Sequence, residues 1–197
     1  MTEENRKLPR KVLVVRRGFG SREKCRFRTI ASLCEYVEMP ATYNVDMTSE
    51  EEAKIYAKRI EDFRPDILVG CSSGASVICH LVRTAKWRGC TWIVSLRTSP
   101  PSLARSLSTF CEDLPILFSH GTEDGVPPRH IKEHIVPGLT RSKVLPFDGG
   151  HSAIGLFSSK EEVSKHLELA YSLRLSKPRA PRRPKPSLFD ALKRNAG

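Results

Sequence analysis

The sequence has no long apolar run. Although 39% of its 197 residues are hydrophobic, no segment approaches the roughly 18 consecutive apolar residues that a membrane-spanning helix needs. The N-terminus, MTEENRKLPRK, is charged and lacks the apolar stretch of a secretory signal. These absences predict an intracellular protein without a transmembrane segment, with the cytoplasm as the expected compartment and the nucleus as the alternative.

The cysteines form no CxxC pair. They are scattered along the chain and mostly lie in apolar contexts such as VICHLV. This pattern favours reduced thiols in a core over disulfides or a zinc site, so we expect no metal centre. The six cysteines are Cys25, Cys34, Cys71, Cys79, Cys90 and Cys111.

Apolar residues are also scarce at the C-terminal end. Residues 176–197, SKPRAPRRPKPSLFDALKRNAG, contain four prolines and seven Lys or Arg against one Asp, and so carry +6 of the net charge of +11. Such a segment cannot bury a core and is predicted to be disordered. We therefore expect a folded domain over residues 1–175 and a basic tail over 176–197, which either solubilises the protein or binds an anionic partner weakly, such as nucleic acid or a membrane surface.

Strands and helices are predicted to alternate through the body of the chain. This alternation is typical of the α/β class: a parallel sheet covered by helices on both faces, in three layers. The expected strands are Lys11–Gly18, Ala41–Met47, Ile67–Val69, Thr91–Thr98, Pro115–Gly121 and Ser142–Phe147. The expected helices are Lys24–Val37, Ser49–Phe63, one after Ser72, one from Pro127 and Ser159–Leu173.

The segment ILVGCSSGASVIC turns from a strand directly into a helix. At the turn, Gly70-Cys71-Ser72-Ser73-Gly74 fits the pattern G-x-S-x-G around Ser72. Glycines two residues before and two after the serine suit a turn too tight for a Cβ atom at either position. The motif alone is also consistent with a phosphate-binding loop or with plain packing.

Two further polar loops follow predicted strands. Asp124 lies in the loop after PILFSHG, and His151 lies in FDGGHS after KVLPF. The carboxyl ends of parallel strands share one edge of a sheet, so these loops are expected to meet. The order Ser72, Asp124, His151 is that of α/β-hydrolases. With GCSSGA, PILFSHGTEDGVPP and FDGGHS, the chain from Lys11 to Leu175 resembles small, dienelactone-hydrolase-like serine hydrolases.

The resemblance implies a role for each residue. Ser72 would be the nucleophile, His151 the base that activates it, and Asp124 the acid that orients His151, with no cofactor. Ser73 as the nucleophile and Asp148 as the acid are the alternatives that the sequence leaves open. His120 has a structural role in this interpretation.

The oxyanion of such a reaction needs two backbone donors. The resemblance places one at Ser73 N–H and the other in the loop containing Gly18 and Phe19, where we choose Phe19 N–H. Arg17 departs from the family pattern at this loop, and would favour anionic substrates at the mouth of the site.

The expected substrate is small. Only residues 99–114 separate two of the predicted strands, too few for a separate cap, and about ten residues precede Lys11, so we expect a minimal, mostly parallel sheet of about six strands and an open site. This favours short acyl esters, thioesters or acylated protein side chains. The alternative is a catalytically inactive interaction module of the same fold, which binds nucleic acid or a protein through its basic tail.

Deletion of residues 176–197 tests the tail. The tail carries no candidate catalytic group, so we expect hydrolysis of a small neutral ester to stay nearly unchanged. Binding of the full chain to nucleic acid or anionic vesicles should be measurable at low salt and largely lost near physiological ionic strength, because phosphate contacts weaken steeply with salt. Loss of hydrolysis on truncation would instead place the domain boundary beyond Leu175.

Overall fold

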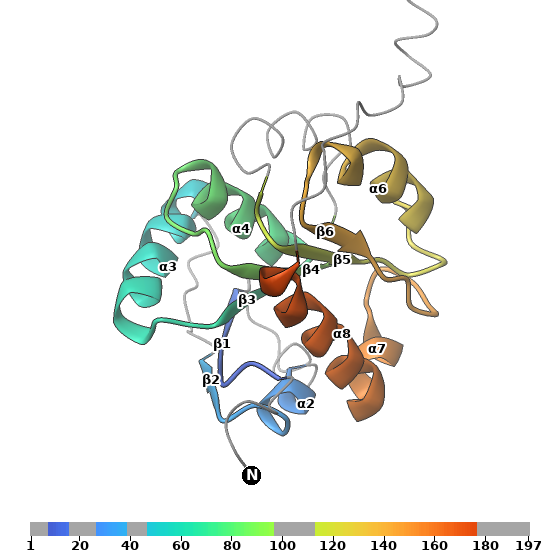
Figure 1. The fold of residues 1–197 in the computed structure, drawn as a ribbon, viewed down its shortest axis with the longest axis horizontal. Helices are drawn as coiled ribbons and strands as arrows, with labels where there is room; N and C mark the ends of the chain where they lie inside the picture. The colour runs from blue at the N-terminus through green and yellow to red at the C-terminus, as the bar shows by residue number, and fades with distance from the viewer. Residues whose placement is uncertain (1–7, 16–26, 39–46, 97–112, 177–197) are drawn as a thin grey trace, which may run out of the picture.

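Six strands form one sheet in which all neighbouring strands are parallel, in the order β2-β1-β3-β4-β5-β6. The computed structural model describes residues 8–15, 27–38, 47–96 and 113–176 (Figure 1). The expected three-layer α/β architecture is confirmed. The strands are β1 (Lys11–Val15), β2 (Tyr36–Glu38), β3 (Ile67–Cys71), β4 (Cys90–Val94), β5 (Ile116–Ser119) and β6 (Ser142–Val144).

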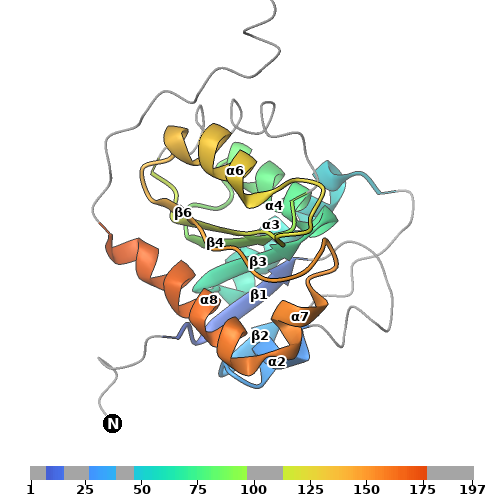
Figure 2. The same ribbon diagram turned by 90° about the vertical axis from the view of Figure 1, so that its right-hand side faces the viewer.

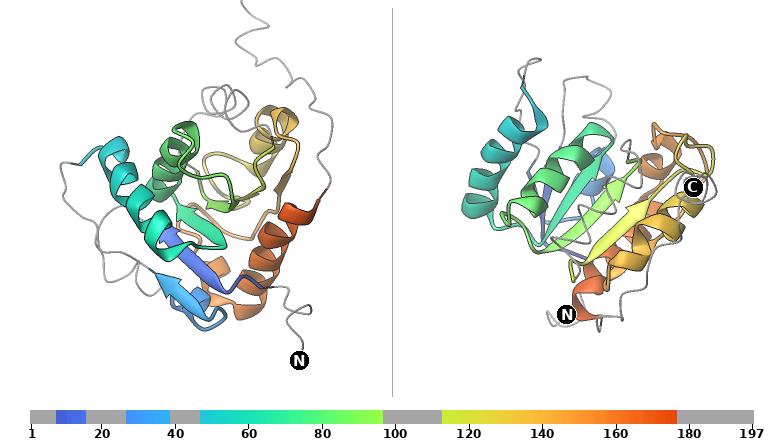
Figure 3. Two further views of the ribbon diagram at one scale, coloured as in Figure 1. Left: turned by 60° about the vertical axis from the view of Figure 1, so that its left-hand side comes forward. Right: turned by 90° about the horizontal axis from the view of Figure 1, so that it is seen from above.

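Helices cover both faces of the sheet (Figure 2). One face carries α3, α4 and α6, and the other carries α2, α7 and α8. Helices α3 and α4 pack side by side (Figure 3). The helices are α2 (Arg28–Ala31), α3 (Ser49–Phe63), α4 (Ser73–Arg83), α6 (Pro128–His134), α7 (Ile154–Ser158) and α8 (Lys160–Ser172), with short 3₁₀ turns at η2 (Val136–Gly138) and η3 (Leu173–Leu175).

The apolar side chains of the strands alternate between these two layers. In β1, Leu13 and Val15 pack against the α3 and α4 side, whereas Val12 and Val14 pack against the α8 side. Because successive strand residues point to opposite faces, a strand covered on both sides must be apolar throughout. Each fully buried side chain of this size contributes about 1.5–3 kcal/mol relative to its exposed state. This explains why the central strands β1 and β3 appear in the sequence as continuous apolar runs.

Helix α3 begins at a capping box. The Thr48 hydroxyl accepts a hydrogen bond from Glu51 N, and the Glu51 carboxylate accepts one from Thr48 N. These bonds satisfy two backbone donors that a helix N-terminus otherwise leaves unpaired. The hydrogen bond from the Thr48 backbone is the largest cause that lowers the pKa of Glu51. Thr48 is therefore the N-cap residue of α3.

The prediction for residues 24–37 is wrong in part. We expected one helix, but the described part contains only the single turn α2, and Tyr36 and Val37 belong to the edge strand β2, where Tyr36 pairs with Lys11. Aromatic and β-branched residues suit a strand, and here sheet pairing prevails over helical spacing. The strand expected at Ala41–Met47 lies outside the described residues except for Met47, which is not in a strand.

The strand order predicts where on the sheet a ligand would bind. Strand β1 lies between β2 and β3, so the connection after β1 leads to one side of the sheet and the connection after β3 leads to the other. In open parallel sheets, ligands bind at the carboxyl ends of the strands near such a point. The connection from β4 to β5 spans only residues 95–115, and no cap domain occurs in the part of the chain that the structure describes.

Candidate active site

Ser72 sits in a strained turn between β3 and α4. Its backbone has φ 53° and ψ −112°, in the positive-φ region that a residue with a side chain rarely adopts. Such a conformation costs about 1–3 kcal/mol and persists only when its surroundings hold it. Ser72 N donates to the Val94 carbonyl of β4 at 2.9 Å, so the sheet itself anchors the turn.

The turn leaves no space for a side chain at Gly70. A Cβ atom there would lie 2.6 Å from Ile78 Cδ1, 3.0 Å from the carbonyl carbon of Gly74 and 3.1 Å from Ala75 N. Gly70, the first glycine of the G-x-S-x-G pattern, therefore allows β3 and α4 to approach at the elbow. This close approach is the physical reason for the spacing seen in the sequence.

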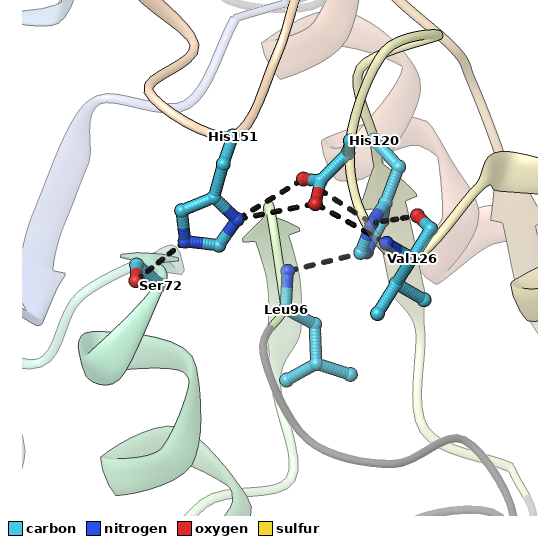
Figure 4. A network of polar contacts seen from close by, with 6 residues as sticks. Ser72, Leu96, His120, Val126 and His151 are labelled. Atoms are coloured by element: carbon cyan, nitrogen blue, oxygen red, sulfur yellow. Dashed lines mark hydrogen bonds and ion pairs between the residues drawn. The ribbon is translucent and has the colours of Figure 1, made fainter.

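Ser72, His151 and Asp124 form a continuous chain of contacts. Figure 4 labels Ser72 and His151 and shows the Ser72 hydroxyl facing the His151 ring. Ser72 Oγ lies 2.8 Å from His151 Nε2, and His151 Nδ1 lies 3.2 Å from both carboxylate oxygens of Asp124. An ionised carboxylate only accepts hydrogen bonds, so it selects the tautomer with the proton on Nδ1. His151 Nε2 is then the acceptor for the Ser72 hydroxyl.

Backbone pairing beyond the strand ends holds the acid loop against the histidine loop. Gly121 forms a parallel bridge with Phe147, Thr122 N donates to the Phe147 carbonyl at 3.0 Å, and Glu123 N donates to the Gly149 carbonyl at 3.0 Å. A Cβ atom at Gly121 would overlap the carbonyl oxygen of Gly149. The two loops therefore continue the register of β5 and β6 as far as the site.

Asp124 is shielded from solvent while His151 is not. The Asp124 side chain is 3% exposed, and its Oδ1 also accepts from Val126 N at 3.3 Å. The His151 side chain is 38% exposed. A buried carboxylate held by hydrogen bonds is an oriented group, whereas a partly exposed imidazole can be reached from solvent.

A second histidine lies behind the acid. His120 is fully buried at the end of β5, with Nδ1 3.2 Å from the Val126 carbonyl, Nε2 3.3 Å from Leu96 N, and Nδ1 3.9 Å from Asp124 Oδ2. Burial is the largest cause that lowers the pKa of His120. The sequence predicts only a structural role for this residue, and no signal in it indicates the two backbone partners.

The alternatives for the nucleophile and the acid are placed differently. Ser73 is the first residue of α4, and it is Ser72 that contacts His151. Asp148 is exposed, and His151 Nδ1 contacts Asp124. The other described histidines lie on helices: His80, His130, His134 and His166.

One of the two expected oxyanion donors lies in the part of the chain that the structure describes. Ser73 lies in the first turn of α4, where backbone N–H groups have no partner within the helix. Gly18 and Phe19, together with Arg17, lie outside the described residues. Ser73 directly follows Ser72 in the chain, and the use of its amide as an oxyanion donor stays a prediction.

The described thiols form no disulfide. These are Cys34, Cys71, Cys79 and Cys90, and burial raises the pKa of Cys34 to about 11. Among the described residues, no group of three or more His, Cys, Asp or Glu side chains is arranged to hold a metal ion. None of the described helices combines the length and apolarity that a membrane crossing requires.

The structure resembles solved α/β-hydrolase structures at low sequence identity. A predicted CIB-like hydrolase from Thermoplasma acidophilum is 15% identical (TM-score 0.57; 88% of this chain, 89% of that chain). The esterase domain of a Rhodothermus marinus protein is 12% identical (TM-score 0.58; 83% of this chain, 86% of that chain). A serine hydrolase involved in carbazole degradation is 14% identical (TM-score 0.59; 84% of this chain, 91% of that chain).

The chain therefore has the α/β-hydrolase fold. No protein-family model and no curated protein sequence matches it. The similarity is one of three-dimensional structure, and a shared fold alone does not determine a function.

Gly121→Ala tests the contact between the acid and histidine loops. The added methyl group must displace the Gly149 carbonyl, so we expect a lower free energy of unfolding in urea and, in a crystal structure, a longer distance from His151 Nδ1 to Asp124 than the 3.2 Å seen here. Gly125→Ala is the matched control, because nothing lies within 4 Å of its Cβ position. Equal behaviour of the two variants would contradict this account of the loop contact.

Proposed function

We propose that the protein is a serine hydrolase that cleaves ester or thioester bonds through an acyl-enzyme on Ser72. The observation that carries the proposal is the continuous set of contacts from Ser72 Oγ through the His151 ring to Asp124. A serine hydroxyl is a poor nucleophile at neutral pH, and a neutral imidazole in hydrogen-bond contact is the base that activates it. The strained turn presents that hydroxyl at the carboxyl edge of the sheet.

Acylation begins when Ser72 Oγ attacks the carbonyl carbon of the substrate and His151 Nε2 takes the hydroxyl proton. The negative charge that develops on the carbonyl oxygen is stabilised by Ser73 N–H and, as the resemblance implies, by Phe19 N–H. Asp124 stabilises the imidazolium electrostatically and holds its ring in place. When the tetrahedral intermediate collapses, His151 gives its proton to the departing alcohol or thiol.

Deacylation repeats these steps with water. His151 removes a proton from water, the water oxygen attacks the acyl carbon, and the bond to Ser72 Oγ breaks. The proton returns from His151 to Ser72, and the carboxylic acid leaves. One water is consumed for each ester or thioester cleaved, and no redox step or cofactor is involved.

The proposed substrates are short acyl esters, acyl thioesters and acylated protein side chains. Three features support this class: the short connection of residues 95–115, the partial exposure of His151, and the exposure of Ile154, three residues after it, at the start of α7. An open site does not enclose a long acyl chain. The solved structures named above include an esterase domain and a serine hydrolase, which agrees with this chemistry.

A fluorophosphonate probe tests the nucleophile. The probe reacts with an activated serine, so we expect it to label the wild-type protein and Cys71→Ala, but not Ser72→Ala. Cys71 is the matched control because it is the adjacent residue in the same turn and carries a thiol. Absence of labelling, with no turnover of p-nitrophenyl acetate, would favour the alternative: an inactive interaction module whose basic tail binds nucleic acid or a protein.

Asp124→Asn and Asp148→Asn distinguish the two acids. An asparagine at position 124 allows the wrong tautomer of His151, so we expect the turnover of p-nitrophenyl acetate to fall by roughly 10⁴-fold in a folded protein. Asp148 is exposed, and its replacement should have a much smaller effect. Circular dichroism checks the folding of both variants, and an equal or larger loss at Asp148 would assign the acid to that residue.

A further inference from the structure

His120 joins two backbone segments that border the site. Its ring lies between the chain that leaves β4, at Leu96, and the acid loop, at Val126 (Figure 4). Leu96 N–H can only donate, so Nε2 must accept. The Val126 carbonyl can only accept, so Nδ1 must carry a proton. The two contacts therefore specify a neutral ring protonated at Nδ1.

Val126 links this ring to the acid through its two neighbouring peptide groups. Its carbonyl, in the peptide bond to Pro127, accepts from His120 Nδ1 at 3.2 Å, and its N–H, in the peptide bond from Gly125, donates to Asp124 Oδ1 at 3.3 Å. The two peptide planes meet at the Val126 Cα atom, so a displacement of this residue that broke one hydrogen bond would also disturb the other. The contacts thus run from His120 through Val126 to the Asp124 carboxylate, and from there to the ring of His151.

The surroundings keep this ring uncharged. His120 is 0% exposed, and a protonated ring would turn a second N–H toward Leu96 N–H, which cannot accept it. Burial, the largest cause, lowers the pKa of His120 and acts in the same direction as this conflict between donors. Of the two rings, His151 is therefore the one that can form an ion pair with Asp124 when it takes up a proton.

We propose that His120 is a positioning residue for the hydrolytic site, which acts through Val126 on Asp124 and so sets the contact between Asp124 and His151. The inference rests on the proposed function, but the structural link can be tested without activity. The contact that matters for this role is the hydrogen bond from His120 Nδ1 to the Val126 carbonyl, rather than the one that Nε2 accepts from Leu96 N.

Two substitutions by amide side chains distinguish the contact with Val126 from the contact with Leu96. Asn places an amide nitrogen as many bonds from Cα as Nδ1, so His120→Asn keeps a donor for the Val126 carbonyl. Gln places an amide oxygen as many bonds from Cα as Nε2, so His120→Gln keeps an acceptor for Leu96 N–H. His120→Phe retains a ring but removes both contacts.

The first readout is kinetic. For p-nitrophenyl acetate we expect kcat of His120→Gln and His120→Phe to fall by about 10²-fold, as for other small displacements of a catalytic group. KM should be unchanged, because the acid acts on the transition state rather than on substrate binding. His120→Asn should keep a kcat near that of the wild type. Equal losses in His120→Asn and His120→Gln would overturn the proposal, even if His120→Phe fails to fold.

The second readout is spectroscopic and does not depend on catalysis. In protein labelled with ¹⁵N-histidine, the His151 Nδ1 proton that faces Asp124 is followed by NMR. We expect its resonance in the wild type and in His120→Asn, and its loss or a large shift in His120→Gln and His120→Phe. An unchanged resonance in folded His120→Gln would show that His120 does not position the pair. Wild-type protein that the fluorophosphonate fails to label would refute the hydrolase function, while this resonance still decides the role of His120.

Discussion

The close contact between the ends of β5 and β6 is the constraint on which the site depends. Asp124 and His151 lie in different loops, so the 3.2 Å contact between their side chains depends on how the two loops are held together. The parallel register of the two strands continues past their ends, through Gly121 and Phe147, and the backbone of Glu123 then bonds to Gly149. The distance between the acid and the histidine is therefore set by main-chain hydrogen bonds, which are more rigid than side chains.

Ser72, the proposed nucleophile, is held in a comparable way, by strands on both sides of β3. Strand β3 pairs with β1 and with β4, and Gly70 lies opposite Val15 on one side and Ile93 on the other. Two residues further along the chain, Ser72 has its unfavourable backbone conformation, which is stabilised by the hydrogen bond from Ser72 N to the Val94 carbonyl. A strained residue needs such surroundings, because each alternative conformation would have to break sheet hydrogen bonds.

Local chemistry explains which parts could be predicted from the sequence. The glycines around Ser72 and the loops bearing Asp124 and His151 follow apolar strands, so the parallel sheet and the meeting of these residues could be predicted. Residues 24–37 could not, because Tyr36 and Val37 continue a helical spacing and only pairing with β1 makes them a strand. The partners of His120 were also hidden, since they are backbone groups and any residue type supplies those. Of the expected oxyanion donors, only Ser73 falls within the described residues.

Burial assigns different tasks to the two histidines that flank Asp124. His120 and His151 approach the same carboxylate, at 3.9 and 3.2 Å, and both could in principle share its charge. His120 is fully buried between two backbone groups that fix its protonation state, and desolvation lowers its pKa, so it cannot exchange protons with a substrate. His151 has a side chain that is 38% exposed and faces the Ser72 hydroxyl. The same carboxylate can therefore orient one imidazole for proton transfer while the other, held neutral, keeps the carboxylate itself in place.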